Sequence, residues 1–585
     1  MSGVNGMVEC VGRRRLVLVL FAAGFAALVW RAMDLQVFNQ GFLQVQGDAR
    51  HLRVVTLAAH RGMILDRNGE PLAVSTPVDS VWANPQELAT AREYWPALAR
   101  LLDLDPDQMR RQLEARAGRE FVYLKRHVDP TIAAQVRALG APGVALQREY
   151  RRYYPDGEVA AQVLGFTDVD DVGQEGLELA YEDWLRGEPG AKRVVKDGKH
   201  TIIENVESIR AARPGRDLTL SIDRRIQYLA YRELKTAVQR HKARSGSVVV
   251  LDTATGEVLA MVNQPSYNPN NRTRWHPSTL RNRAVTDLFE PGSTLKPFTI
   301  AAGLETGQYR PNTPIETTPG FYRVGANLVR DVHNYGALDV TGVIRKSSNV
   351  GSAKIALSLD KQVFWSLLHR LGFGSLTASG FPGEASGLLV NHRRWRPIEV
   401  ATLSFGYGLS VTPLQLAQAY GVLAADGALR PVSFLKLEKA PRAEPVLSAR
   451  TAQDVRVMLE EAVAPEGTAP AARVAGYRVG GKTGTVRKSI AGGYANDRYL
   501  SVFSGLAPTS RPRLSVVVMI NEPNNGDYYG GKVAAPVFSA VMAGALRFLN
   551  VAPDALPQTP DEVPHELPAP LPGAAVQRVA LGGGP

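Results

Sequence analysis

A serine and a lysine lie three residues apart, Ser293 and Lys296, in the segment EPGSTLKPFTIAAGL. Residues i and i+3 share one face of a helical turn, so their side chains can meet where the Ala-rich stretch begins. A serine hydroxyl needs a base within hydrogen-bond reach to act as a nucleophile. At a helix start, the positive end of the helix dipole also favours a developing oxyanion. The pair is therefore a candidate nucleophile and base for acyl transfer.

A Ser-x-x-Lys pair is weak evidence by itself. Average composition gives about two in a chain of this length, and a second pair joins Ser433 to Lys436. That pair lies in RPVSFLKLEK, whose alternation predicts a strand with Ser and Lys on opposite faces. Taken alone, Lys296 is more often a solvated lysine at a capped helix start than a base.

Two further motifs follow Ser293 along the chain. Ser347-x-Asn349 lies in KSSNVGSAK, and KTGT occupies residues 482–485. Each motif alone has an ordinary interpretation, the first as turn or cap residues and the second as a strand end with a bulge. All three motifs in this order indicate one serine acyl-transfer site.

The three motifs resemble those of penicillin-binding transpeptidases and serine β-lactamases. The N-terminal half narrows the resemblance, because RGMILDRNGEPLA, RRYYPDGEVAAQVLGF and GQEGLELAYEDWL are similar to the pedestal motifs of class B, monofunctional penicillin-binding proteins. FEPGSTLKPF and LSFGYGLSVTPLQLAQAY are most similar to the septal, cell-division (FtsI-type) branch. The resemblance covers residues 13–550.

The resemblance implies a role for each motif residue. Lys296 would be the base, Ser347 would relay the proton to the departing amine, Asn349 would orient the substrate amide, and Lys482 would supply positive potential. Thr483 and Thr485 would bind the terminal carboxylate, and the backbone N–H groups of Ser293 and Thr485 would form the oxyanion hole. The candidate catalytic residues are Ser293, Lys296, Ser347, Asn349 and Lys482, and the candidate substrate- and oxyanion-binding residues are Thr483, Gly484 and Thr485.

Strands at both ends of a helical middle should carry these motifs. Residues 245–263, SGSVVVLDTATGEVLAMVN, predict a hairpin around Thr255-Gly256. Residues 498–508 and 513–523 are apolar enough for central strands, and the segments between are mostly helical. We therefore expect an α/β (α+β) fold, in which one antiparallel sheet from sequence-distant strands is packed by helices. By resemblance, this is the penicillin-binding/serine β-lactamase-like transpeptidase domain.

The chain before this domain should form an elongated pedestal of mixed structure. RGMILDRNGEPLAV, residues 61–74, predicts two short strands around an Asn68-Gly69 turn. Residues 188–216 predict extended connecting structure. Asp223 is placed to cap the helix that follows it.

The N-terminus predicts a membrane anchor. Arg13 to Arg15 precede the uncharged run LVLVLFAAGFAALVW, residues 16–30. Basic residues before an apolar run hold the N-terminus in the cytoplasm. The run is shorter than the roughly 20 residues of a spanning helix and also fits a signal-peptide core. No clear small-x-small cleavage site follows, which favours an uncleaved anchor over a cleaved signal.

These observations give an expected order of domains. A cytoplasmic N-terminus at 1–12 and a transmembrane anchor at 13–37 precede the pedestal at 38–216. The transpeptidase domain follows at 217–550, and a Pro-rich tail that we expect to be disordered occupies 551–585.

Composition excludes several other classes. The net charge of +12 is spread along the chain rather than clustered with aromatic residues, which disfavours a nucleic-acid-binding protein. Cys10 is the only cysteine, so no internal disulfide can form. The histidines show no metal-ligand spacing, and we expect no metal and no cofactor.

The predicted protein is a bitopic bacterial inner-membrane enzyme with a periplasmic catalytic domain. It would acylate Ser293 with a donor stem peptide, release D-alanine, and cross-link the acyl group to an amine of a neighbouring stem. The resemblance implies peptidoglycan stem peptides, β-lactams, a polytopic septal glycosyltransferase and other division proteins as partners. Two alternatives are a D,D-carboxypeptidase or β-lactamase-type hydrolase of the same fold, and a non-catalytic β-lactam sensor or scaffold. The acceptor amine, and whether this is the main septal enzyme or a paralogue, stay open.

Overall fold

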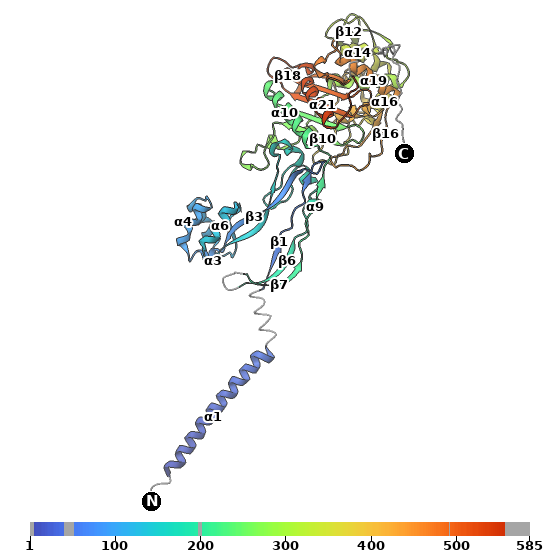
Figure 1. Ribbon diagram of the computed structural model, residues 1–585. Helices are drawn as coiled ribbons and strands as arrows, with labels where there is room; N and C mark the ends of the chain where they lie inside the picture. Colours follow the sequence, from blue (N-terminus) through green and yellow to red (C-terminus); the bar gives the residue numbers. More distant parts are fainter. Residues whose placement is uncertain (1–4, 40–51, 197–201, 491, 556–585) are drawn as a thin grey trace, which may run out of the picture.

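The computed structural model describes residues 5–39, 52–196, 202–490 and 492–555. Figure 1 shows three successive parts, an N-terminal helix, a narrow pedestal of long strands, and a broad helix-covered domain. The order agrees with the expected sequence of anchor, pedestal and catalytic domain.

The N-terminal part is a single long helix, α1 (Asn5–Met33), which continues as a π-helical turn over Asp34–Phe38. Residues 12–38 contain an 18-residue window with a mean hydropathy of 2.1 and are long and apolar enough to cross a membrane. Apolar side chains such as Phe21 and Leu28 are exposed along this span. A helix that is apolar and unburied fits a lipid environment better than water.

A three-stranded antiparallel sheet forms one side of the pedestal. Its order is β1 (Leu52–Leu57), β6 (Gly190–Lys196) and β7 (Ile202–Arg210). The expectation of extended connecting structure for residues 188–216 was incomplete, because β6 and β7 within this segment pair with each other as antiparallel strands. The partner strand β1 lies more than a hundred residues earlier in the chain, and such a distant pairing leaves no local signal.

A second sheet carries the other lobe of the pedestal. Its path is β4 (Val122–Val128), β3 (Pro71–Ala83), β2 (Ile64–Leu65) and β8 (Leu218–Thr219), and β5 (Val144–Tyr153) pairs with β3. The predicted hairpin around Asn68-Gly69 is confirmed by the antiparallel pairing of β2 with β3. A small core joins this sheet to the helices around it; these are α3 (Pro85–Leu88), α4 (Trp95–Leu101), α5 (Pro106–Glu114) and α6 (Pro130–Leu139).

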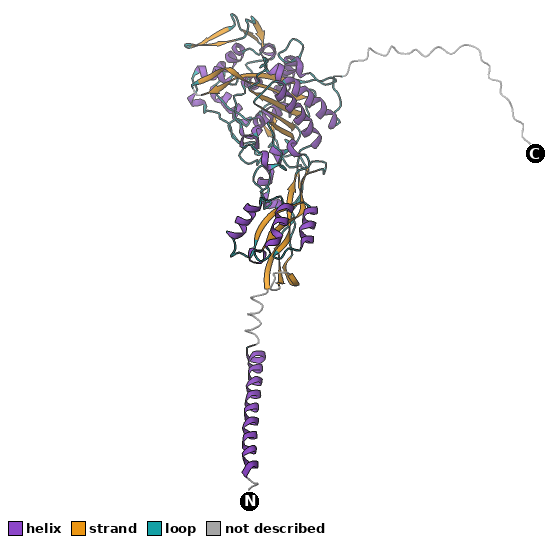
Figure 2. Cartoon of the chain, turned by 90° about the vertical axis from the view of Figure 1, so that its left-hand side faces the viewer, coloured by secondary structure: helices purple, strands orange, loops and turns teal. Residues whose placement is uncertain are grey.

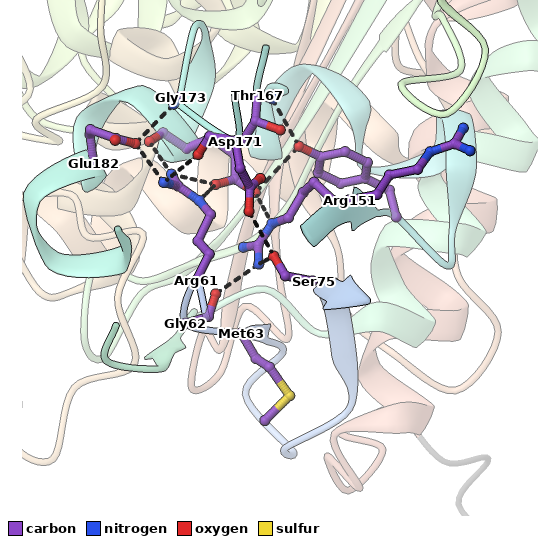
Figure 3. A network of polar contacts seen from close by, with 12 residues as sticks. Arg61, Gly62, Met63, Ser75, Arg151, Thr167, Asp171, Gly173 and Glu182 are labelled. Carbon is purple, nitrogen blue, oxygen red and sulfur yellow. Dashed lines mark hydrogen bonds and ion pairs between the residues drawn. The ribbon is translucent and has the colours of Figure 1, made fainter. Parts of the chain in front are cut away.

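The three pedestal motifs meet in one buried ionic network (Figure 3). Glu178 accepts hydrogen bonds from Arg61 Nε at 2.8 Å and from Arg152 Nε at 2.6 Å. Arg61 also donates to Glu182 at 2.6 Å, and the Tyr154 hydroxyl lies 3.4 Å from Glu178. A buried charge is tolerated when it is paired in this way. The network therefore ties together strand β5, the loop before β2, and α8 (Gly176–Ala180) with α9 (Glu182–Leu185).

The C-terminal domain contains the predicted antiparallel sheet, in the order β10-β9-β19-β18-β17. Its strands are β9 (Ser245–Asp252), β10 (Val258–Gln264), β17 (Gly480–Ile490), β18 (Gly493–Ala507) and β19 (Leu514–Asn521). The hairpin around Thr255-Gly256 and the two central strands are confirmed. One face of the sheet packs against α10 (Arg224–Arg240) and α21 (Ala535–Phe548). Asp223 caps α10 as predicted, accepting the Arg225 N–H.

The larger core joins the other face of the sheet to the helical middle of the domain (Figure 2). Its helices are α13 (Lys296–Glu305), α14 (Val340–Lys346), α15 (Asn349–Ser358), α16 (Lys361–Arg370), α17 (Pro397–Leu403), α18 (Pro413–Ala424) and α19 (Ala449–Val463). The shorter elements are α7 (Ala161–Leu164), α11 (Pro277–Leu280), α12 (Arg283–Thr286), α20 (Gly530–Val533), β11 (Pro314–Glu316), β12 (Phe321–Val324), β13 (Asn327–Arg330), β14 (Ala337–Asp339), β15 (Ala428–Leu429) and β16 (Glu444–Pro445).

The second Ser-x-x-Lys pair lies outside any named strand. Ser433 and Leu435 form isolated bridges with Glu257 and Leu220, respectively. The predicted strand over this segment is thus reduced to single pairings.

Candidate active site

The candidate nucleophile lies in a tight turn at the start of a buried helix. Ser293 belongs to a 3-10 turn, Gly292–Leu295, and Lys296 begins α13. Gly292 has φ +56°, and a Cβ there would meet Val486 Cγ2 at 2.5 Å. Glycine thus allows the turn to pack directly against β17. The Ser293 hydroxyl has no hydrogen-bond partner among the described residues, and Ser293 is only half-buried.

Four of the predicted site residues form one hydrogen-bonded cluster. Lys296 Nζ donates to Asn349 Oδ1 at 2.8 Å and to Ser347 Oγ at 3.1 Å. Lys482 Nζ donates to the same Ser347 Oγ at 2.9 Å. Because Ser347 Oγ already accepts from both lysines, its own proton points elsewhere. The motifs that are far apart in the sequence therefore meet beside Ser293.

The two lysines of the cluster are completely buried, with no exposed side-chain area. Burial and the positive charge of Lys482 lower the pKa of Lys296 well below its ordinary value. Burial lowers the pKa of Lys482 to about 7. Burial disfavours an ammonium and a second cation adds repulsion. Both lysines therefore lose a proton more readily than an exposed lysine, and for Lys296 both burial and the charge of Lys482 contribute.

Asp331 positions the Ser-x-Asn motif, although sequence reasoning did not single it out. Its carboxylate accepts hydrogen bonds from Ser348 Oγ at 2.6 Å, Asn349 N at 2.5 Å and Val350 N at 3.0 Å. Ser347 is held in the left-handed region at φ 59°. Asp331 follows β13 in a segment without a recognisable motif, so only the tertiary fold reveals its contact with α15.

Strand β17 carries KTGT along the edge of the sheet. Lys482 pairs with Ser504 and Thr485 with Ser501 in regular register, and the only irregularity lies further on, between Arg487 and Ser489. The alternative of a strand end with a bulge is therefore excluded for residues 482–485. A Cβ on Gly484 would lie 3.0 Å from the Pro291 carbonyl oxygen, so glycine brings this strand against the nucleophile turn.

The two threonines of β17 are held by neighbouring loops. Thr485 Oγ1 accepts the Gly530 N–H at 3.0 Å, which leaves its hydroxyl proton free to donate to a ligand. Thr483 Oγ1 lies 3.3 Å from Thr468 Oγ1. Sequence reasoning did not select Thr468 or Gly530, since neither belongs to a motif. Within the described residues, no group of three or more His, Cys, Asp or Glu side chains could hold a metal ion.

Comparisons with known proteins match both halves of the chain. Residues 246–543 match the penicillin binding protein transpeptidase domain, and residues 56–220 match the penicillin-binding protein dimerisation domain. A probable peptidoglycan D,D-transpeptidase PenA of Neisseria meningitidis is 46% identical, over 93% of this chain and 94% of the relative. The peptidoglycan D,D-transpeptidase FtsI of Escherichia coli is 44% identical, over 92% of both chains.

A solved structure supports the fold of the C-terminal domain. The apo transpeptidase domain of Burkholderia pseudomallei penicillin-binding protein 3 is 44% identical, with a TM-score of 0.54, and covers 58% of this chain and 98% of that domain. The antiparallel sheet packed by helices and the preceding dimerisation-type domain are thus confirmed. From two matched domains and relatives that align over nearly their whole length, we conclude that the chain belongs to the class B penicillin-binding proteins of the PenA/FtsI type, which are peptidoglycan D,D-transpeptidases.

Proposed function

We propose that this enzyme cross-links peptidoglycan stem peptides at the division septum through an acyl-enzyme on Ser293, and that β-lactams acylate the same serine. The observation that carries the proposal is the shared contact of Lys296 and Lys482 with Ser347 Oγ. This shared contact supports the assignment of Lys296 as the base, Ser347 as the proton relay and Lys482 as the source of positive potential. The E. coli relative named FtsI supports the septal role.

Acylation begins when neutral Lys296 takes the proton of Ser293. The Ser293 oxygen then bonds to the carbonyl carbon of the penultimate D-alanine, and the peptide bond to the terminal D-alanine breaks. Ser347 passes a proton to the departing amine. Backbone N–H groups of Ser293 and Thr485 stabilise the oxyanion, a contribution typically worth a few kcal/mol.

The KTGT strand binds the leaving end of the donor peptide. Thr483 and Thr485 hydrogen-bond the terminal carboxylate, and Gly484 allows the close approach of β17 to the nucleophile turn. Lys482 adds positive potential for the same carboxylate, while Asn349 orients both Lys296 and the peptide amide. An amine of a second stem peptide then attacks the acyl-enzyme and releases Ser293.

The proposed domain boundaries are unchanged from the sequence analysis, with the anchor at 13–37, the pedestal at 38–216 and the catalytic domain at 217–550. The parallel pairing of β8 with β2 links the start of the catalytic domain to the pedestal. Most of the proposed tail, residues 556–585, lies outside the described residues.

The proposed location is the bacterial inner membrane, with α1 as an uncleaved single span, the N-terminus in the cytoplasm and the catalytic domain in the periplasm. The Arg13–Arg15 cluster supports this orientation. A polytopic septal glycosyltransferase and other division proteins are the proposed partners. An intact N-terminus in the membrane fraction is expected, and a mature form that begins between residues 24 and 35 would contradict the anchor.

The test of the catalytic proposal is labelling with a fluorescent penicillin, followed by the lifetime of the adduct. We expect a long-lived adduct on Ser293 and none in Ser293→Ala. Rapid turnover of the adduct would favour the hydrolase alternative, and an adduct without transfer to any amine would favour the sensor. Depletion in the native host should give filaments, whereas round cells would contradict the septal role.

A further inference from the structure

Glu290 lies three residues before Ser293, and only one of its two carboxylate oxygens is hydrogen-bonded. Oε1 accepts the Gly408 N–H at 2.8 Å and the Tyr494 hydroxyl at 3.1 Å. Oε2 is shielded from solvent and has no hydrogen-bond partner among the described residues. A shielded carboxylate oxygen without a partner costs free energy, so Glu290 keeps an unused acceptor three residues before the nucleophile.

Three buried carboxylates elsewhere in the described residues are each paired with a cation. Glu178 is bound by Arg61 at 2.7 Å, Glu149 by Arg126 at 2.9 Å, and Asp252 by Arg513 at 2.6 Å. In the part of the chain that the structure describes, Glu290 forms no ion pair with any Lys, Arg or His. Burial accordingly raises its pKa. Glu290 thus lacks the countercharge that its counterparts have.

The backbone places Glu290 at the edge of the catalytic cleft. The carbonyl of Pro291 lies against Gly484, and Gly292 lies against Val486, so residues 290–293 follow the strand that carries KTGT. Tyr494, which holds the Glu290 carboxylate, is 45% exposed and contacts Tyr407 edge-to-face at 5.5 Å. The carboxylate therefore lies against Gly408 and Tyr494, on the residue that precedes the nucleophile turn, while the two lysines lie at Ser347.

From this arrangement, and resting on the proposed function, we propose that Glu290 binds an ammonium group of the peptidoglycan stem peptide. Transfer of the acyl group needs an amine acceptor, and peptide amines of this kind are largely protonated at neutral pH. A carboxylate with an unused oxygen beside Ser293 provides the complementary charge. Two amines have this chemistry, the acceptor amine and a side-chain amine of the donor stem, and the experiment below separates them.

The first arm uses a thioester donor without any amine, with D-alanine as the acceptor, and compares wild type with Glu290→Gln. If the acceptor amine binds Glu290, the ratio of aminolysis to hydrolysis falls about ten-fold, as expected for loss of a hydrogen bond to a charged group. The second arm compares a stem-peptide donor with its acetylated form. If the donor amine binds Glu290, kcat/KM falls about ten-fold for the free-amine donor only.

Glu438→Gln is the matched control, because it makes the same chemical change at an exposed carboxylate of the same domain. Acylation by benzylpenicillin, which carries no ammonium, reports whether the cleft is intact in each variant. Glu290→Asp keeps the charge and should recover part of either effect. The proposal is overturned if Glu290→Gln changes neither the ratio of aminolysis to hydrolysis in the first arm nor kcat/KM for the free-amine donor in the second. It is also overturned if both Glu290 variants lose penicillin acylation. A wild-type protein that forms no aminolysis product would instead refute the proposed transpeptidase function.

Discussion

The side chains of Lys296 and Lys482 converge on one atom, Ser347 Oγ, at 3.1 and 2.9 Å. Both lysines are fully buried, so two ammonium groups in this position would repel each other in a medium that screens charge poorly. Near pH 7, where Lys482 is still partly protonated, Lys296 can therefore act as a base while Lys482 carries positive charge. The two should respond differently to substitution.

Replacing each lysine with Arg and with Ala separates the base from the fixed charge. Arginine stays protonated and cannot act as a base, so Lys296→Arg should lower the acylation rate as far as Lys296→Ala does. Loss of a general base typically costs about 10²–10⁴-fold. Lys482→Arg should retain distinctly more activity than Lys482→Ala. The measurement is the second-order acylation rate by penicillin, and near wild-type acylation by Lys296→Arg would refute the assignment of the base.

Buried Lys482 should make the stability of the protein depend on pH. Its pKa is lowered to about 7 in the folded protein, against about 10.4 in an unfolded chain. Between these values the unfolded chain binds more protons, so the free energy of unfolding should rise with pH, by up to about 1.4 kcal/mol per unit. Below pH 7 this dependence ends, because the lysine is protonated in both states.

Denaturant titrations of wild type and Lys482→Met from pH 6 to 10 test this dependence. As the pH rises, the free energy of unfolding of wild type should increase relative to that of Lys482→Met. A difference that stays flat over this range would show that Lys482 keeps its proton when the protein folds.

Asp331 should control the rate of acylation without touching the substrate. It accepts three hydrogen bonds from the segment Ser348–Val350, and hydrogen bonds to a charged group contribute about 1.5–3 kcal/mol each. Asp331→Ala should release Asn349 from Lys296 and slow acylation about ten-fold or more. Asp331→Asn keeps an acceptor oxygen and should recover part of the rate. Equal rates in both variants would indicate a purely electrostatic effect of the carboxylate.

Replacing Glu178 should lower the stability of the pedestal and leave the acylation of the folded protein unchanged. Glu178→Gln leaves Arg61 and Arg152 buried without their shared carboxylate, which typically costs about 3–5 kcal/mol. Thermal unfolding should therefore show an early transition, while the folded fraction is still acylated by penicillin. Glu114→Gln, a change at an exposed carboxylate of α5, serves as the control and should unfold like wild type.

The sequence by itself determined the type of chemistry and the main elements. The order of the three motifs predicted Ser293 and its partners as the site, since a nucleophilic serine needs a base nearby. Local patterns also gave the hairpins at Asn68-Gly69 and Thr255-Gly256 and the cap at Asp223. Turn and cap residues act on their immediate neighbours, so such features can be read from short segments.

The tertiary structure alone decided which distant groups meet. The pairing of β1 with residues 190–196, the contact of Asp331 with α15 and the unused oxygen of Glu290 depend on chain segments that are separated in sequence. The pKa values of Lys296 and Lys482 also depend on burial and on each other's charge. Burial and long-range contacts arise only when the whole chain packs, because they belong to pairs of segments and not to any one motif.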